Sequence, residues 1–251
     1  MMLFPATIVF LFCVFPEITK ADDPPERVVL RIGRTYTPVY NATKEHLATL
    51  RRGLAWLMPE VRRSILFIDI LPGDSEHFQK KEAAHCHRPD DEERPVEGMR
   101  ICFSRDTVTE ANLWHEAGHA WLISMPTGFD EEWQEISDFA YAEYTGAEDR
   151  KLRQKRYPAA GLLSGYATTN YREDVAEWFS CIYEYVSGGK DAFAKITDRD
   201  DPCYLQKLRM LRDWGAIGAE DYNLIIKLFR SKRRLCLDNR QVALNPGGIY
   251  G

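Results

Sequence analysis

Residues 108–125 read VTEANLWHEAGHAWLISM, and this stretch contains the most informative pattern of the chain. Its apolar positions recur at helical spacing, and the face expected to be buried consists of Leu113, Trp114, Ala117, Ala120, Trp121 and Leu122. A helix would bring His115 and His119, four residues apart, to one side, where both imidazoles can bind one metal ion. Glu116 would lie beside them, placed to contact a water molecule rather than to act as a third ligand.

Two further signals concern this helix. Thr107 and Glu110 have the spacing of a capping box, which predicts that the helix begins there. Gly118 stands between the two histidines and lacks a side chain, at a known cost in helix propensity. We therefore expect another element to approach this helix closely at Gly118.

The segments before and after the helix differ in kind. Alternating or continuous apolar runs predict strands at 27–34, 64–71 and 98–104, with a helix over 44–58 and a long surface loop over 74–97. Helical spacing follows at 130–144, 170–186, 202–214 and 219–235. Strands first and helices afterwards indicate an α+β fold. We expect a small N-terminal sheet lobe, a mainly helical C-terminal lobe, and the HEAGH helix on the floor of a cleft between them.

The first residues indicate where the protein acts. Residues 1–21 form an apolar leader that ends in Thr19-Lys20-Ala21, which is typical of a signal peptide rather than of a membrane span. Residues 22–251 would then form a single domain, secreted to the extracellular space, monomeric and without stable membrane insertion. A formal net charge of -5 provides no basic field, so we expect no nucleic-acid partner.

Five cysteines follow the leader, which allows at most two disulfides and one free thiol. We expect the pairs Cys86–Cys102 and Cys203–Cys236, and a free Cys181 buried in an apolar helix. The sequence His85-Cys86-His87 also suggests a second metal site. We favour a disulfide with exposed histidines, because residues two apart on an irregular loop rarely converge.

A metal bound by two histidines needs a third protein ligand. A histidine six residues after His119 is excluded, because Met125 stands there. Asp138, nineteen residues after His119, offers a carboxylate within the helical segment WQEISDFAYAEY. Glu173 offers another, within YATTNYREDVAEWF. Spacing alone leaves Asp138 and Glu173 both open.

The surroundings of Glu173 distinguish it from Asp138. Glu177 shares a helix face with Glu173, so one carboxylate can bind the metal while the other accepts a hydrogen bond from a ligand histidine. Tyr166 lies seven residues before Glu173, where a phenol can donate a hydrogen bond to an oxyanion.

HEAGH followed by Y-x6-E-x3-E resembles the gluzincin metallopeptidases related to the catalytic domain of anthrax lethal factor and to the bacterial Pro-Pro endopeptidases. The resemblance covers roughly residues 98–188 and implies a zincin-like fold. It implies one Zn²⁺ bound by His115, His119 and Glu173, with Glu116 and Tyr166 as catalytic residues and Glu177 beside a ligand histidine. The chain departs from the family in an insertion-like stretch at 126–165, which keeps Asp138 as the alternative third ligand.

The same resemblance implies an activity. It is that of a zinc-dependent metalloendopeptidase, which hydrolyses a peptide or protein substrate with metal-activated water and a glutamate general base, and which the leader predicts to be secreted. From its position, the strand at 98–104 would be an edge strand that holds the substrate in extended form. The alternative function is a catalytically inactive secreted binding protein on a zincin scaffold.

Overall fold

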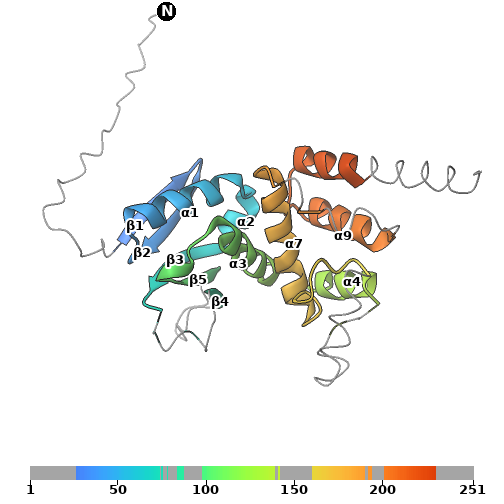
Figure 1. The fold of residues 1–251 in the computed structure, drawn as a ribbon, viewed down its shortest axis with the longest axis horizontal. Coiled ribbons are helices and arrows are strands. Elements are labelled where there is room, and N and C mark those ends of the chain that lie inside the picture. The colour runs from blue at the N-terminus through green and yellow to red at the C-terminus, as the bar shows by residue number, and fades with distance from the viewer. Residues whose placement is uncertain are drawn as a thin grey trace, which may run out of the picture.

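The computed structural model describes residues 27–73, 75, 78, 84–87, 98–138, 141, 160–189, 192–193 and 201–229. An N-terminal five-stranded mixed sheet precedes a mainly helical C-terminal region (Figure 1), which confirms the predicted α+β class. The predicted leader, residues 1–21, lies outside the described residues. Among the helices that are described, none is both long and apolar enough to cross a membrane.

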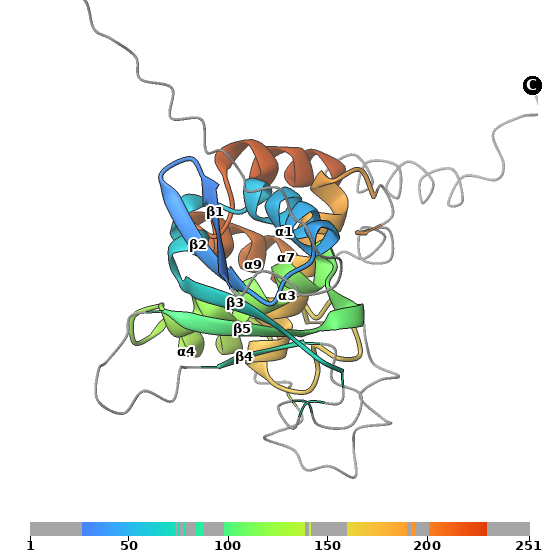
Figure 2. The ribbon, with the colours of Figure 1, turned by 90° about the vertical axis from the view of Figure 1, so that its left-hand side faces the viewer.

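The sheet has the strand order β1-β2-β3-β5-β4 (Figure 2). Its strands are β1 (Arg27–Ile32), β2 (Thr35–Tyr40), β3 (Ile65–Leu71), β4 (Ala84–His87) and β5 (Met99–Ser104). β3 is parallel to both β2 and β5, whereas β1 pairs with β2, and β4 with β5, in antiparallel fashion. The three predicted strands are confirmed. The prediction of a continuous loop over 74–97 is wrong, because β4 lies within it.

β5 is an inner strand, so the prediction of an edge strand at 98–104 is wrong. Its residues pair with β3 on one side, and Arg100 to Phe103 pair with β4 on the other. Five of its six residues are buried, as expected for a strand covered on both faces. Within the described sheet the edge next to β5 belongs to β4.

Three helices connect and cover the sheet: α1 (Lys44–Trp56), α2 (Pro59–Arg63) and α3 (Glu110–Ile123). α1 confirms the helix predicted at 44–58, and α3 is the predicted HEAGH helix. The indole Nε1 of Trp114 donates a hydrogen bond of 3.1 Å to the carbonyl of Gly53, which fastens α3 to α1. All six α3 residues expected on the apolar face are buried, as predicted.

The C-terminal region contains α4 (Phe129–Ile136), α7 (Tyr171–Val186), α9 (Pro202–Asp213) and a helix at 219–229. α7 and α9 confirm the helices predicted at 170–186 and 202–214. α4 ends at Ile136 rather than at Tyr144, and Asp138 follows it in a left-handed conformation with φ 49°. In Figure 1, α3 and α7 lie between the sheet and the pair α4 and α9.

The approach of α7 to α3 explains Gly118. A Cβ at this position would lie 2.9 Å from the Cα of Ala176 and 3.2 Å from the ring of Phe179. Both of those residues belong to α7, so the prediction that another element approaches Gly118 closely is confirmed. The two helices therefore meet at the level of His115 and His119.

Candidate metal centre

Local capping fixes the start of α3. The N-cap is Thr109, whose hydroxyl accepts a hydrogen bond of 3.0 Å from the backbone N–H of Asn112. The predicted capping box of Thr107 and Glu110 is wrong, because Thr107 lies in a short 3-10 helix (Arg105–Thr107). Its hydroxyl donates instead to the carbonyl of Ser104, at 2.9 Å.

α7 begins with a cap that places a carboxylate toward α3. The side chain of Asn170 accepts a hydrogen bond of 2.9 Å from the backbone N–H of Glu173. Glu173 and Asp174 stand in the first turn, where the helix dipole favours negative charge. The cap and the dipole thus fix the position from which Glu173 reaches across to the two histidines.

Three predicted ligands from two helices converge on one point. The Oε2 atom of Glu173 lies 3.2 Å from Nε2 of His115 and 3.4 Å from Nε2 of His119. The two imidazole rings have centroids 5.0 Å apart and planes inclined by 80°. All three donor atoms lie within 4.8 Å of one another. The side chains are 16–18% exposed, so an ion bound among them would be reachable from solvent.

The distances from Oε2 of Glu173 to the two histidine Nε2 atoms match those between ligands of one metal ion. Ligand atoms about 2.0–2.1 Å from a tetrahedral zinc ion are separated from one another by about 3.3 Å. Two histidine nitrogens and a glutamate oxygen are also a donor set that zinc enzymes use. The three residues therefore suit a metal ion both in donor chemistry and in the two measured separations.

The electrostatics of the cluster favour a cation. Burial lowers the pKa of His115. Hydrogen bonds with the carboxylates of Glu173 and Glu177 outweigh this effect and raise the pKa of His115 to about 10. Burial raises the pKa of Glu173, but His115 and His119 more than reverse this effect and hold it below its usual range. A partly buried carboxylate thus faces two imidazoles, and the group favours the binding of positive charge, either as a proton or as a metal ion.

Glu177 lies behind His115, on the side away from the convergence point. Its Oε1 is 3.5 Å from Nδ1 of His115, while Nε2 of the same ring faces Glu173. Burial raises the pKa of Glu177, but His115 and Ser164 lower it more strongly, so the carboxylate stays charged. Glu177 is therefore placed to orient the His115 ring, as carboxylates do behind ligand histidines.

The two residues expected to act in catalysis differ in exposure. Glu116 is only 5% exposed on α3, whereas Tyr166 is 49% exposed, and its ring centroid lies 6.0 Å from that of His115. Burial and the nearby carboxylate of Glu173 raise the pKa of Tyr166 to about 12. The negative charge of Glu116 also contributes to raising the pKa of Tyr166. At neutral pH the Tyr166 hydroxyl is therefore protonated and can donate a hydrogen bond.

Asp138 is not part of this arrangement. It is exposed, it follows the last turn of α4, and its backbone N–H bonds to the carbonyl of Glu135 at 3.0 Å. Within the described residues, two groups could hold a metal ion, and neither contains Asp138. The structure therefore brings Glu173, and not the alternative Asp138, to the two histidines.

The second of these groups consists of His85, His87 and Cys102, and it overturns the predicted disulfide. Cys86 and Cys102 are both free thiols. Cys86 pairs with Ile101 across the two strands, whereas Cys102 pairs with His85, so the two sulfur atoms project from opposite faces of the sheet. No disulfide can join them across the sheet.

The other cysteine predictions have different outcomes. Cys181 is a free thiol, as predicted, and donates a hydrogen bond of 3.2 Å to the carbonyl of Ala192. The expected pair Cys203–Cys236 stays a prediction, because Cys236 lies outside the described residues.

A buried network on α7 was not foreseen in the sequence. Asp174 accepts hydrogen bonds from Trp133 Nε1 at 2.8 Å, from the Tyr141 hydroxyl at 2.7 Å, and from the ammonium group of Lys207. Asp174 and Lys207 are both fully buried. Asp174 lies one helical turn before the buried Trp178, which was the available signal that it faces the interior.

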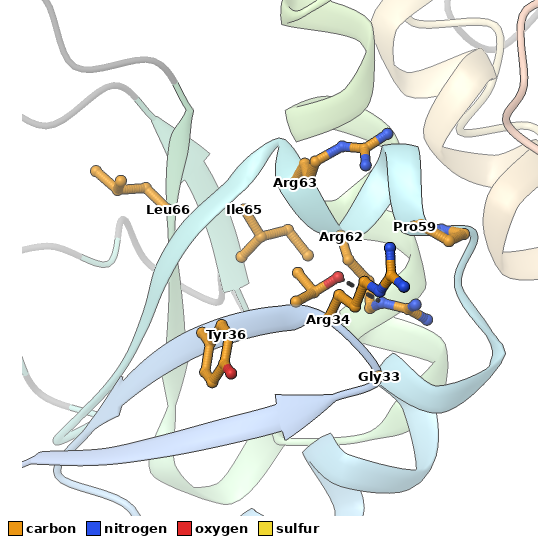
Figure 3. Close-up of a pocket in the computed structure, with 9 residues that line it drawn as sticks. Gly33, Arg34, Tyr36, Pro59, Arg62, Arg63, Ile65 and Leu66 are labelled. Atoms are coloured by element: carbon orange, nitrogen blue, oxygen red, sulfur yellow. Dashed lines mark hydrogen bonds between the residues drawn. The ribbon is translucent and has the colours of Figure 1, made fainter. Parts of the chain in front are cut away.

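A pocket of about 560 Å³ lies elsewhere, beside the β1–β2 turn and α2, and contains none of the cluster residues (Figure 3). Three arginines line it, but two of them are already engaged in hydrogen bonds or an ion pair within the chain. Arg62 donates to the carbonyls of Leu54 and Leu57, and Arg63 pairs with Glu60 at 2.9 Å. We place the candidate site at the histidines and Glu173 rather than in this pocket, because only the former group has convergent donor atoms.

Comparisons with family models, with curated proteins and with solved structures found no match to this chain.

Proposed function

We propose that this protein is a zinc-dependent metalloendopeptidase of the gluzincin type, with a zincin-like fold. The observation that carries the proposal is the convergence of His115 Nε2 and His119 Nε2 on one carboxylate oxygen of Glu173, at 3.2 and 3.4 Å. Zinc in such a site lowers the pKa of a bound water molecule to about 7 and polarises a substrate carbonyl.

The neighbours of the cluster support catalysis rather than structural metal binding. Structural zinc sites are usually closed by four protein ligands, whereas catalytic sites keep a position for water or substrate. Only three protein donors converge here within the described residues. Glu177 contacts His115 from behind, and the ring centroid of Tyr166 lies 6.0 Å from that of the same imidazole, so both side chains lie where the proposed reaction needs them.

In the proposed reaction each nearby side chain has a separate task. Glu116 takes a proton from the attacking water and returns it to the leaving amine. Tyr166 stays protonated because its pKa is about 12, so its hydroxyl donates a hydrogen bond to the oxyanion of the scissile carbonyl. Glu177 keeps the ring of His115 in one orientation through Nδ1.

The substrate would be an extended peptide that pairs with β4. This strand is the edge of the described sheet, and it lies against α3 near Glu116, whose charge contributes to raising the pKa of Cys86. An extended peptide added to a sheet edge gains main-chain hydrogen bonds without a particular sequence. We also propose secretion, on the strength of the apolar leader at residues 1–21.

The test is the substitution Glu116→Gln in the full chain. We expect the cleavage rate of a mixed peptide library to fall by about 10²–10⁴-fold, because the general base is lost. The zinc content should be unchanged, because Glu116 is not a ligand. Glu184→Gln, an exposed carboxamide substitution on α7, is the matched control and should leave both quantities at their native values.

Two results would contradict the proposal. One is a native protein that binds zinc yet cleaves no peptide, which would support the inactive binding protein instead. The other is a Glu116→Gln protein with native activity, which would mean that the hydrolysis does not depend on this glutamate.

A further inference from the structure

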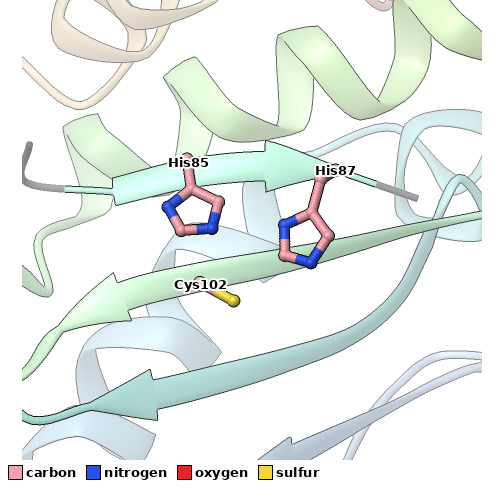
Figure 4. A group of neighbouring side chains, drawn as sticks. All are labelled: His85, His87 and Cys102. Carbon is pink, nitrogen blue, oxygen red and sulfur yellow. The ribbon is translucent and has the colours of Figure 1, made fainter. Parts of the chain in front are cut away.

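A second group of metal-binding side chains lies on the sheet, apart from the HEAGH cluster. It combines His85 and His87 of β4 with Cys102 of β5 (Figure 4). The imidazole nitrogens and the thiol sulfur lie within 4.8 Å of one another. The centroids of the two imidazole rings are 4.9 Å apart.

The geometry of the strands brings these side chains together. Residues two apart in a strand project from the same face, so His85 and His87 point the same way. Cys102 is the direct antiparallel partner of His85 and shares this face. Cys86, between the two histidines, projects from the opposite face, near Glu116 of α3. The outer face of β4 and β5 therefore holds three donors, while the inner face packs on α3.

The donors have the chemistry of a transition-metal site. Two imidazoles and one thiolate select borderline or soft ions such as Zn²⁺, whereas Mg²⁺ and Ca²⁺ prefer oxygen ligands. Cys102 is fully buried, and the two histidines are partly buried. Burial raises the pKa of the Cys102 thiol to about 11, so the uncomplexed group is a protonated thiol rather than a reactive thiolate.

The charges around Cys102 are balanced. Arg100, which is on the same face, is held by Asp69 in an ion pair of 2.7 Å. Asp69 also accepts a hydrogen bond of 2.8 Å from the side-chain amide of Asn41. The guanidinium group is thus neutralised by a neighbouring carboxylate, and a metal cation next to Cys102 would not meet an uncompensated positive charge.

We propose that His85, His87 and Cys102 form a second metal site, which binds Zn²⁺ or a similar late first-row ion and fastens the edge strand β4 to β5. On binding, the ion forms a bond to the sulfur of Cys102, the S–H bond breaks, and its proton passes to solvent. The proposal does not depend on peptidase activity.

Cobalt titration of the full chain tests this site apart from the HEAGH cluster. A thiolate bound to Co²⁺ gives a charge-transfer absorption in the near ultraviolet, whereas two histidines and a glutamate do not. We expect this absorption to appear at one bound Co²⁺ in the Glu173→Gln protein, which lacks a ligand of the other cluster, and to disappear when Zn²⁺ is added. Cys102→Ser should abolish it, and the matched control Cys86→Ser should retain it.

A second substitution avoids the buried thiol. The double variant His85→Ala/His87→Ala changes two partly buried side chains, and it should weaken the Co²⁺ binding seen by this absorption by more than about 100-fold. This lower limit follows because even residues that only orient ligands contribute about 10–100-fold.

Absence of the absorption in the native chain under reducing conditions would overturn the proposal. So would an absorption that survives Cys102→Ser or depends on Cys86. Loss of peptidase activity alone has no bearing on either outcome, because the absorption reports only a metal–sulfur bond.

Discussion

Glu173 and Asp174 are neighbours in sequence, on the first turn of α7, yet their carboxylates have opposite surroundings. Asp174 is fully buried and receives the ammonium group of Lys207 together with hydrogen bonds from Trp133 and Tyr141. Glu173 is 18% exposed at its side chain and, within the described residues, faces the two imidazoles of His115 and His119. One carboxylate has a cation supplied by the chain, and the other lies where a cation can be added.

This difference separates a structural role from a functional one. A buried charge must be paired within the fold, because leaving it unpaired costs several kcal/mol. Asp174 is paired in this way, and its three partners fix the rotation of α7. That rotation sets the direction of Glu173, since consecutive residues of a helix project about 100° apart. The built-in ion pair thus positions the carboxylate that we assign to the metal.

Breaking the buried pair should have the largest effect on stability. Lys207→Met removes the ammonium partner of a fully buried carboxylate whose pKa burial raises, and we expect the free energy of unfolding to fall by about 3–5 kcal/mol. Chemical denaturation at neutral pH measures this change. Lys227→Met, at an exposed position, is the matched control and should change stability by less than about 0.5 kcal/mol.

A double variant sharpens that result. Adding Asp174→Asn to Lys207→Met removes the unpaired carboxyl group while keeping an oxygen that accepts hydrogen bonds from Trp133 and Tyr141, so part of the lost stability should return. If Lys207→Met lowers the free energy of unfolding by less than about 1 kcal/mol, Asp174 does not depend on Lys207 as its partner, and the proposed difference between Asp174 and Glu173 is wrong.

Glu173→Gln should have a smaller effect on stability, and this effect should appear only when metal is present. Zinc at 100 times its dissociation constant stabilises the native chain by about 2.7 kcal/mol through this site, and the variant should lose that increment. Thermal unfolding with and without zinc, next to the control Glu184→Gln, measures the loss. A native zinc increment that survives intact in Glu173→Gln would exclude this carboxylate as a ligand.

Glu177→Gln should give the smallest change of the three. The substitution keeps a side chain of similar size but removes the charge near Nδ1 of His115. Residues that orient ligand histidines contribute about 10–100-fold to metal affinity, so a loss in that range is expected. Competition with a chelator of known affinity measures it, and an unchanged affinity would mean that Glu177 does not orient His115.

The parts of the fold that follow from periodicity were predictable. α1, α3, α7 and α9 have long apolar faces, and β1, β3 and β5 have clear apolar patterns. β4 was missed because its four residues, AHCH, are short and polar and gain strand conformation only through pairing with β5. The edge strand and the disulfide were misassigned for the same reason, since both depend on where β4 pairs.

The site was predictable as far as local spacing reaches. The positions of His115 and His119 follow from a single helix, and Gly118 indicated a close neighbour without naming it. The choice between Asp138 and Glu173 depends on how α7 packs on α3, which spacing does not contain. The pairing of Asp174 with Lys207 spans 33 residues and joins α7 to α9, so it too required the tertiary structure.

The most direct test of the central claim is to locate the metal. A crystal grown with zinc, and measured at the zinc absorption edge, gives an anomalous difference map that shows where each ion lies. We predict a peak about 2.0–2.2 Å from Nε2 of His115, Nε2 of His119 and Oε2 of Glu173. A map without a peak between these three atoms, or with the ion bound by the two histidines and another carboxylate, would contradict the account.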